Sequence, residues 1–509
     1  MPQFKPYNQN QALLLPPQLT EWLPKNHICY VINDVVEQLD MSEVEKTYSE
    51  IGCPGYNPRA LIKLLFFSYA RGIRSSRKIE ELSHESVAYR YLSGNQQPDH
   101  GTISLFRKKH LESLEGMFAS IVMLCDGLGM RDPRNISIDG TVLKANASRK
   151  KTYRAEDLVK LKKKIKGILT EAEKKDEEED EKYGKGKGYN DMPEHLIDRK
   201  ERQQEIERLL EKLKKIEIAE QEIVEKQKEA KTTEEKNRKN SQSHNLTDGG
   251  AALMKMKDGK VYKPAYNGQV SASNQVVVAY GVSDDNVDTP LLMGMINTSE
   301  RNTGIRVKKV KADASYFSKA NIEKLEEKGI DGYIPDRDKQ REEKQEKAKE
   351  IPAYDRRNFT YEATADEYVC PENQRLKLVR TDQGTKKYMS RSCGECPVKS
   401  NCTQGKNRYV TIDPQLDKYK TEMRKKLNTE KGKATYVERM SEVEPVFGNI
   451  IYNQNAGHFL CRGKPMVKVE FGLSCIAHNL IKIANWLKEK NQTIRELQLA
   501  PLMRLPAVA

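Results

Sequence analysis

Residues 136–145 read ISIDGTVLKA. Apolar Ile136 and Ile138 alternate with polar Ser137 and Asp139, which is the two-residue period of a strand with one buried face. Aspartate is disfavoured inside strands, so Asp139 calls for a reason other than folding. The stretch therefore predicts a strand that carries a functional carboxylate.

Further strand-like runs follow after a long gap, at 261–282, 307–315 and 330–336. Helical periodicity occurs over 289–298 and 318–328. Strands that alternate with helices predict an α/β layer architecture. A further helical part follows near the end of the chain, with segments at Glu438–Ile450 and Cys475–Leu487.

Residues 1–130 are expected to be helical, with apolar residues at three- and four-residue spacing over 28–40, 58–71, 75–92 and 101–127. Two basic clusters lie among these helices: Arg71, Arg74, Arg77 and Lys78, then Arg107, Lys108 and Lys109. Short helices with basic ends are typical of helix-turn-helix DNA readers. An ordinary helical bundle with solvated charges explains the local pattern equally well.

An insertion interrupts the α/β part between the first strand and the second. Its two runs of apolar residues at helical spacing are Leu158, Leu161, Ile165 and Ile168, then Ile206, Leu209, Leu213, Ile216 and Ile223. The heptad-like spacing predicts a long antiparallel helical hairpin. The alternative is a charged, disordered linker.

Charge is unevenly distributed along the 509 residues. The formal net charge is +14, of which 131–150 contributes +3 and 241–509 contributes +11. A basic surface confined to part of a chain suits a polyanion such as nucleic acid. General solubility is the alternative, although it needs far less charge.

Targeting signals are not visible in the sequence. The start, MPQFKPYNQNQ, lacks the basic and apolar regions of a secretion signal. The longest apolar stretches, such as Leu64–Phe67 and Ile121–Cys125, are too short to span a bilayer. Nine cysteines, an odd number, fit a reduced cytosol better than a disulfide framework. We expect a cytoplasmic protein with no membrane partner.

Four of the cysteines form a cluster with the spacing C-x22-C-x2-C-x5-C: Cys370, Cys393, Cys396 and Cys402. Closely spaced thiolates are the ligands of tetrahedral structural zinc. We expect a closed, non-catalytic zinc site here. Incidental free thiols are the alternative.

Three carboxylates are candidate metal ligands. Metal-dependent cleavage of a phosphodiester uses hard divalent ions, whose ligands are carboxylate oxygens. Asp139 lies in a strand, Asp313 ends the run VKKVKAD, and Glu444 lies in a helical segment. A single acidic residue is more often a cap or a turn residue, so the case depends on the combination. Glu438, Glu442 and Glu470 compete with Glu444 for the third place.

Three segments that carry these acids resemble the catalytic segments of bacterial insertion-sequence transposases of the DDE type. They are ISIDGTVLKANAS, KADASYFS and YVERMSEVEPVFGNI, in this order. The pattern Arg-x-x-x-x-Glu-Pro-Val-Phe-Gly over 439–448 is the most specific piece. The run HNLIKI at 478–483 and the helical PDHGTISLFRKKH at 98–110 fit the same family.

The resemblance implies an RNase H-like fold, with the first Asp on the first strand, the second after the fourth and the Glu on a later helix. It implies Mg²⁺ or Mn²⁺ held by Asp139, Asp313 and Glu444, which would be the catalytic residues. It also implies that Tyr436 and Arg439 help to position DNA. We expect further DNA contacts from Lys144, Arg107, Lys108 and Arg74.

The expected architecture is thus an RNase H-like mixed sheet with an all-α N-terminal domain, an inserted hairpin and a Cys-rich insertion. The expected ranges are a DNA-binding domain at 1–130, a catalytic core from 131–150, 246–340 and 430–490, the hairpin at 151–245, the Cys-rich insertion at 341–429 and a tail at 491–509.

The expected activity is cleavage of the inverted ends of an insertion sequence and joining of the 3′ ends to target DNA. Double-stranded DNA would be the substrate, and two ends must be brought together, so a homodimer is expected. One departure is Ile451, where many family members have Lys or Arg. The alternatives are an RNase H-like nuclease that does not join ends and a decayed, DNA-binding copy.

Overall fold

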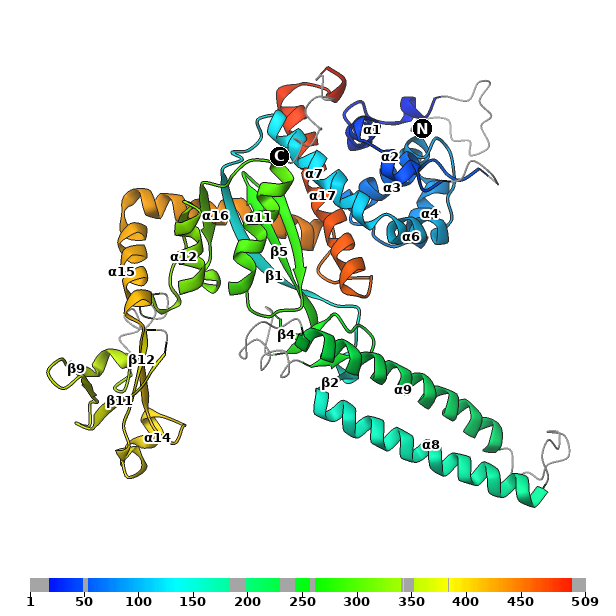
Figure 1. The fold of residues 1–509 in the computed structure, drawn as a ribbon. Helices are drawn as coiled ribbons and strands as arrows, with labels where there is room; N and C mark the ends of the chain where they lie inside the picture. The colour runs from blue at the N-terminus through cyan, green and yellow to red at the C-terminus, as the bar shows by residue number, and fades with distance from the viewer. Residues whose placement is uncertain are drawn as a thin grey trace, which may run out of the picture.

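The structure is a computed structural model, which describes residues 18–48, 54–183, 198–228, 243–256, 261–339, 342, 352–382 and 384–496. A six-stranded mixed sheet lies at its centre (Figure 1). The strand order is β4-β5-β1-β7-β8, and β6 also pairs with β5. The strands are β1 (Asn135–Lys144), β4 (Ala252–Lys255), β5 (Tyr262–Ser273), β6 (Val276–Ser283), β7 (Lys309–Ala312) and β8 (Asp331–Tyr333).

Strand directions in the sheet match the expected RNase H-like core. Strand β1 is antiparallel to β5 and parallel to β7, and β7 is parallel to β8. Strands β5 and β6 form a hairpin whose turn residues Asn274 and Gln275 have positive φ angles of 47° and 64°. Such angles suit the tight turns that match the twist of paired strands. The predicted α/β layer architecture is therefore confirmed.

Helices cover both faces of this sheet. On one face, α11 (Leu292–Thr303) and α12 (Lys319–Glu327) pack on Ile138 and Ala312. On the other face lie α16 (Glu430–Gly448) and α17 (Lys464–Lys490). Side chains alternate between faces along a strand, so Asp139, the neighbour of Ile138, points toward α16.

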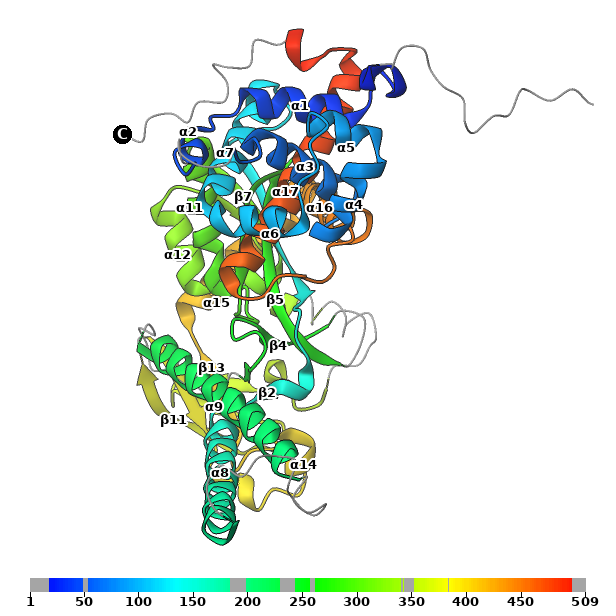
Figure 2. The same cartoon turned by 90° about the vertical axis from the view of Figure 1, so that its right-hand side faces the viewer.

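The N-terminal helices pack against α17 and share one continuous hydrophobic core with it and with the sheet. In Figure 2 they lie in front of α17. Two predicted helices are each divided, at Ser86 and at His110. The helices are α1 (Ile28–Gln38), α2 (Ser42–Glu45), α3 (Pro58–Ala70), α4 (Ser76–Glu85), α5 (Val87–Leu92), α6 (His100–Lys109) and α7 (Leu111–Gly127).

The insertion forms two long helices, α8 (Ala155–Tyr183) and α9 (Asp198–Lys228), which project from the sheet (Figure 1). The two helices pack together through a small cluster of buried side chains: Leu158, Ile165, Ile216 and Ala219. The short strands β2 (Thr152–Tyr153) and β3 (His244–Asn245) pair at its base. The connection between the helices, 184–197, lies outside the described residues.

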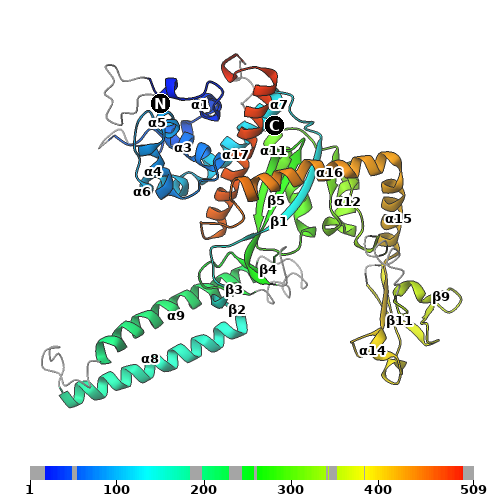
Figure 3. The same cartoon turned by 180° about the vertical axis from the view of Figure 1, so that it is seen from behind.

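The Cys-rich insertion forms a second sheet, which Figure 3 shows at the far end of α15 (Pro414–Asn428) from α16. Its five antiparallel strands have the order β13-β12-β11-β10-β9. A small core of Phe359, Leu376, Tyr388 and Val410 holds it together. The strands are β9 (Thr360–Glu362), β10 (Glu367–Val369), β11 (Arg375–Asp382), β12 (Thr385–Met389) and β13 (Tyr409–Ile412), and α14 (Lys399–Cys402) lies before β13.

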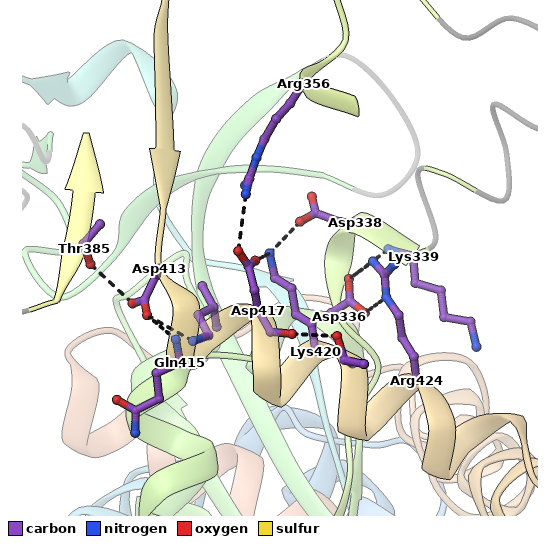
Figure 4. Close-up of polar contacts among 12 residues, drawn as sticks. Asp336, Asp338, Lys339, Arg356, Thr385, Asp413, Gln415, Asp417, Lys420 and Arg424 are labelled. Carbon is purple, nitrogen blue, oxygen red and sulfur yellow. Dashed lines mark hydrogen bonds and ion pairs between the residues drawn. The ribbon is translucent and has the colours of Figure 1, made fainter. Parts of the chain in front are cut away.

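Ion pairs along α15 join this second sheet to the central one, as Figure 4 shows. The Arg424 guanidinium donates to both oxygens of Asp336 at 2.8 Å each. The Lys420 ammonium donates to Asp338 at 2.8 Å. Because the Asp336 carboxylate is buried, this ion pair is better protected from water than the other contacts of the junction. The Cys-rich side adds two contacts, from Arg356 to Asp417 and from Thr385 to Asp413.

None of the helices within the described ranges combines the length and the apolar character needed to cross a membrane.

Candidate active site

Two of the predicted carboxylates lie on neighbouring parallel strands, Asp139 in the middle of β1 and Asp313 directly after the end of β7. The last parallel pair between β1 and β7 is Ile138 with Ala312. Asp139 and Asp313 each follow one member of this pair. Both therefore continue onto the face of the sheet that α16 covers. The Asp139 side chain is 20% exposed, so an ion or a phosphate from solvent can reach it.

The backbone after β7 fixes the direction of Asp313. Its carboxylate accepts a hydrogen bond from the Ser315 amide at 2.8 Å and another from the Ser315 hydroxyl. It thereby caps a single 3-10 turn, Ala314–Tyr316. A carboxylate that caps a turn satisfies amide groups that would otherwise lack a partner. Local sequence thus explains why Asp313 points out of the strand end.

Helix α16 places a cation next to the aspartate pair. An Nη1 atom of Arg439 lies 3.1 Å from an Asp139 carboxylate oxygen. Burial acts to lower the pKa of Arg439, but Asp139, Tyr436 and Asp313 raise it more, so the guanidinium stays charged. The guanidinium also lies 5.8 Å from the centre of the Tyr436 ring. The structure thus brings Asp139, Asp313, Tyr436 and Arg439 together.

The third predicted acid does not lie beside this pair. Glu444 is exposed, whereas Glu442 is buried and points at the sheet. The Glu442 carboxylate lies 2.8 Å from the ammonium of buried Lys311 and accepts from the Ser137 hydroxyl. Two residues along a helix turn the side chain by about 200°, which puts Glu444 on the opposite side. Glu442 is already neutralised by Lys311, so it is poorly suited to bind a metal ion.

Within the ranges that the structure describes, no three His, Cys, Asp or Glu side chains lie close enough together to hold one metal ion. Asp139 and Asp313 supply two hard oxygen ligands, which suits Mg²⁺ or Mn²⁺. The helix beyond Glu444 is irregular, because Pro445 lies inside α16 and a π-helical turn follows at Asn449–Asn453. Proline removes one helical hydrogen bond, and π-turns often mark functional sites.

Two of the predicted DNA contacts have side chains that the structure buries. Arg74 is 4% exposed and forms an ion pair of 2.7 Å with Glu470 of α17. Arg107 is 7% exposed and donates to the Tyr69 hydroxyl at 3.2 Å and to the Arg74 carbonyl at 3.1 Å. Arg74 thus joins the N-terminal helices to α17, whereas Arg107 holds the N-terminal helices to one another.

The other predicted contacts are accessible. Lys144 ends β1 and is exposed, and so is Lys108 at the end of α6. Ile451 lies in the π-helical turn, half-buried against the main core. An apolar residue at this position is therefore accounted for by packing.

The four clustered cysteines line one small cavity of the second sheet. Backbone amides donate to two of the sulfurs, from Gln374 to Cys370 and from Arg408 to Cys393, each at 3.3 Å. Burial raises the pKa of the Cys402 thiol, and the other three cysteines raise it further, while Arg408 lowers it. The chemistry of the donors fits zinc, although the sulfurs are not grouped as closely as a bound ion requires.

Sequence reasoning missed a polar network behind the aspartate pair. Gln269, Asp288 and Tyr316 form it with Asn267. Gln269 is a long polar residue that is buried between Gly268 and Val270 of β5, and Gly140 lies opposite it. A buried amide facing a glycine is the signal that could have revealed it.

Two segments of the chain match known families. Residues 369–484 match the model described as Transposase DDE domain. Residues 17–109 match the model described as Transposase domain (DUF772). The first segment includes Glu444 and the cysteine cluster, and the second includes helices α1 to α6. No curated protein and no solved structure matches the chain.

Proposed function

Because both matched segments are transposase domains, the chain is an insertion-sequence transposase of the DDE type, and we propose that it cuts the ends of its element and joins them to target DNA. The observation that carries this proposal is the Asp139–Asp313 pair, which directly follows the last paired residues of two adjacent parallel strands. The fold brings these two acids together from positions 174 residues apart in the sequence and places them next to Arg439. Two neighbouring carboxylates of this kind suit a metal-dependent phosphodiester reaction.

Asp139 and Asp313 would hold Mg²⁺ or Mn²⁺, and Glu444 would be the third ligand. When bound, the metal would lower the pKa of the attacking water or 3′-hydroxyl and stabilise the leaving oxygen. Glu444 would join the pair when DNA binds, and the irregular helix around Pro445 supports such an adjustment. The Ser315 amide and hydroxyl hold the Asp313 carboxylate in place for this role.

Arg439 would have two tasks in this scheme. Without metal its guanidinium balances the charge of Asp139. With DNA bound it would contact a phosphate next to the scissile bond, together with Tyr436, because guanidinium groups recognise phosphate through paired donors. Lys144 and Lys108 would add contacts to more distant phosphates, which makes binding dependent on salt.

The assembly would be a homodimer that holds two element ends, and the projecting hairpin α8–α9 would serve this assembly or grip DNA. The cysteine cluster would hold a structural zinc ion that closes the second sheet. The amide donors to Cys370 and Cys393 support this role, because such hydrogen bonds stabilise thiolate ligands.

The test is an assay with element-end DNA, supercoiled target plasmid and Mg²⁺. A transposase yields both cut ends and products in which the 3′ ends are joined to the plasmid. Cutting without any joined product would support an RNase H-like nuclease instead. Binding of ends without either product would support a decayed, DNA-binding copy.

A further inference from the structure

A chain of hydrogen bonds crosses the sheet on the face opposite α16, directly behind the aspartate pair. Gln269 of β5 lies next to Gly140 of β1. Its amide nitrogen donates to an Asp288 carboxylate oxygen at 2.9 Å, and its amide oxygen accepts from the Tyr316 hydroxyl. Gln269 is 2% exposed and Tyr316 is fully buried. We call these three side chains the relay.

The direction of these bonds is fixed by chemistry. An ionised carboxylate only accepts, so Asp288 forces the amide nitrogen of Gln269 toward itself and the amide oxygen toward Tyr316. Asn267 donates to the same Asp288 oxygen at 2.6 Å, which keeps that carboxylate in place. Burial raises the pKa of Tyr316 well above its usual value, and Asp288, Asp139 and Asp313 raise it further. The phenol therefore stays protonated and donates.

Gly140 leaves the space through which the relay passes. A Cβ atom at this position would lie 2.2 Å from the Gln269 amide nitrogen and 3.0 Å from the Asp288 carboxylate. Any side chain here would push the Gln269 amide out of place. This close approach gives a physical reason for glycine directly after Asp139.

The relay ends at the turn that carries Asp313. Tyr316 is the last residue of that turn, and Asp313 caps it. Thr289, the neighbour of Asp288, donates from its hydroxyl to the Ser315 carbonyl at 2.7 Å. The loop at 288–289 thus holds the turn twice, once directly and once through Gln269.

We propose that Asp288, Gln269 and Tyr316 are positioning residues that set Asp313 beside Asp139 for metal binding. The proposal rests on the proposed function, because it assigns the aspartate pair to the metal. The relay does not touch the metal. It fixes the backbone turn from which one ligand projects, and outer hydrogen bonds of this kind orient metal ligands.

The test compares Tyr316→Phe with the wild-type chain in two assays. Mn²⁺ binding to the DNA-free protein is measured by titration calorimetry, and cleavage of end DNA is measured as a function of Mg²⁺. Loss of an outer-shell partner should raise the metal concentration for half-saturation about 10-fold in both. Cleavage at saturating Mg²⁺ should recover to near the wild-type rate, because the ligands themselves remain.

Two further variants separate positioning from general damage. Gly140→Ala leaves every polar group of the relay but displaces the Gln269 amide, so it should act in the same direction. Ser299→Ala is the matched control. It removes a buried hydroxyl that bonds Ser271 on the same face at 2.9 Å and does not lead to the turn. It should leave the metal dependence unchanged.

The outcomes distinguish the relay from the proposed function. Wild-type metal dependence in Tyr316→Phe, alongside loss of cleavage in Asp139→Asn, would overturn the relay and leave the proposed function standing. Cleavage that stays lost at saturating Mg²⁺ would also overturn the relay, since a structural role predicts it. Normal cleavage by Asp139→Asn would overturn both.

Discussion

Replacing Arg74 with methionine tests whether this residue stabilises the fold or contacts DNA. Besides its ion pair with Glu470, the guanidinium donates to the His458 carbonyl at 2.6 Å and the Asn455 carbonyl at 2.5 Å. Both side chains of the ion pair are almost fully buried, 3% and 2% exposed. Arg74 therefore links the loop after α3 to α17 and to the segment before it.

The expected loss follows from this burial. Removing one partner of a buried ion pair typically costs about 3–5 kcal/mol, since the remaining charge stays out of water. The Leu460 and Cys461 amides still donate to Glu470 and keep the loss near the lower end of that range. A second change, Glu470→Gln, should recover part of the loss by removing the stranded charge.

Urea unfolding followed by circular dichroism measures the stability, and binding of end DNA at several salt concentrations measures the phosphate contacts. Lys78 belongs to the same basic cluster but is exposed and forms a surface ion pair with Glu81, so Lys78→Met should leave unfolding close to wild type. Arg74→Met should be strongly destabilised and keep the wild-type salt dependence. Wild-type stability with a shallower salt dependence would refute the structural role.

Three further predictions concern separate parts of the molecule. Lys144→Ala should reduce the slope of log affinity against log salt by about one, because it removes one phosphate contact; an unchanged slope in a DNA-binding titration would exclude Lys144 from the interface. Buried His478 has its pKa lowered to about 4, chiefly by burial. Because folding favours the neutral imidazole, the free energy of unfolding should be highest above pH 6.5. It should decrease by up to about 3 kcal/mol as the pH falls to 4. His478→Gln should flatten this loss in urea titrations, and an equal pH dependence in both proteins would contradict the assignment. Finally, zinc analysis of the purified protein should find the metal in wild type and in the control Cys461→Ser but not in Cys393→Ser, and its absence from wild type would disprove the zinc site.

Strand periodicity was sufficient to predict the centre of the fold. The alternation around Asp139 predicts β1, and the position of Asp313 after a basic strand predicts the end of β7. Parallel pairing of these strands then brings the two acids together. Both strands are visible in the local sequence pattern, and the pairing of the two acids follows from the sheet order of the expected fold. These features could therefore be predicted from the sequence.

Features that depend on packing between distant segments could not be predicted. Arg74 and Arg107 occur in basic clusters that look like a DNA-binding surface, yet their partners are Glu470 and Tyr69. The motif identifies Glu444 but not the face of α16 on which it lies, because that face depends on which residues pack against the sheet. The relay links Gln269 to residues 19 and 47 positions away, and no local pattern contains that information.

Mg²⁺-dependent cleavage of end DNA by Asp139→Asn is the decisive test of the aspartate pair on β1 and β7 as the metal-binding site. The substitution keeps the size of the side chain and removes its charge. Cleavage and joining should be abolished, while binding of end DNA and the unfolding transition should stay near wild type. Cleavage at the wild-type rate by Asp139→Asn would contradict this assignment.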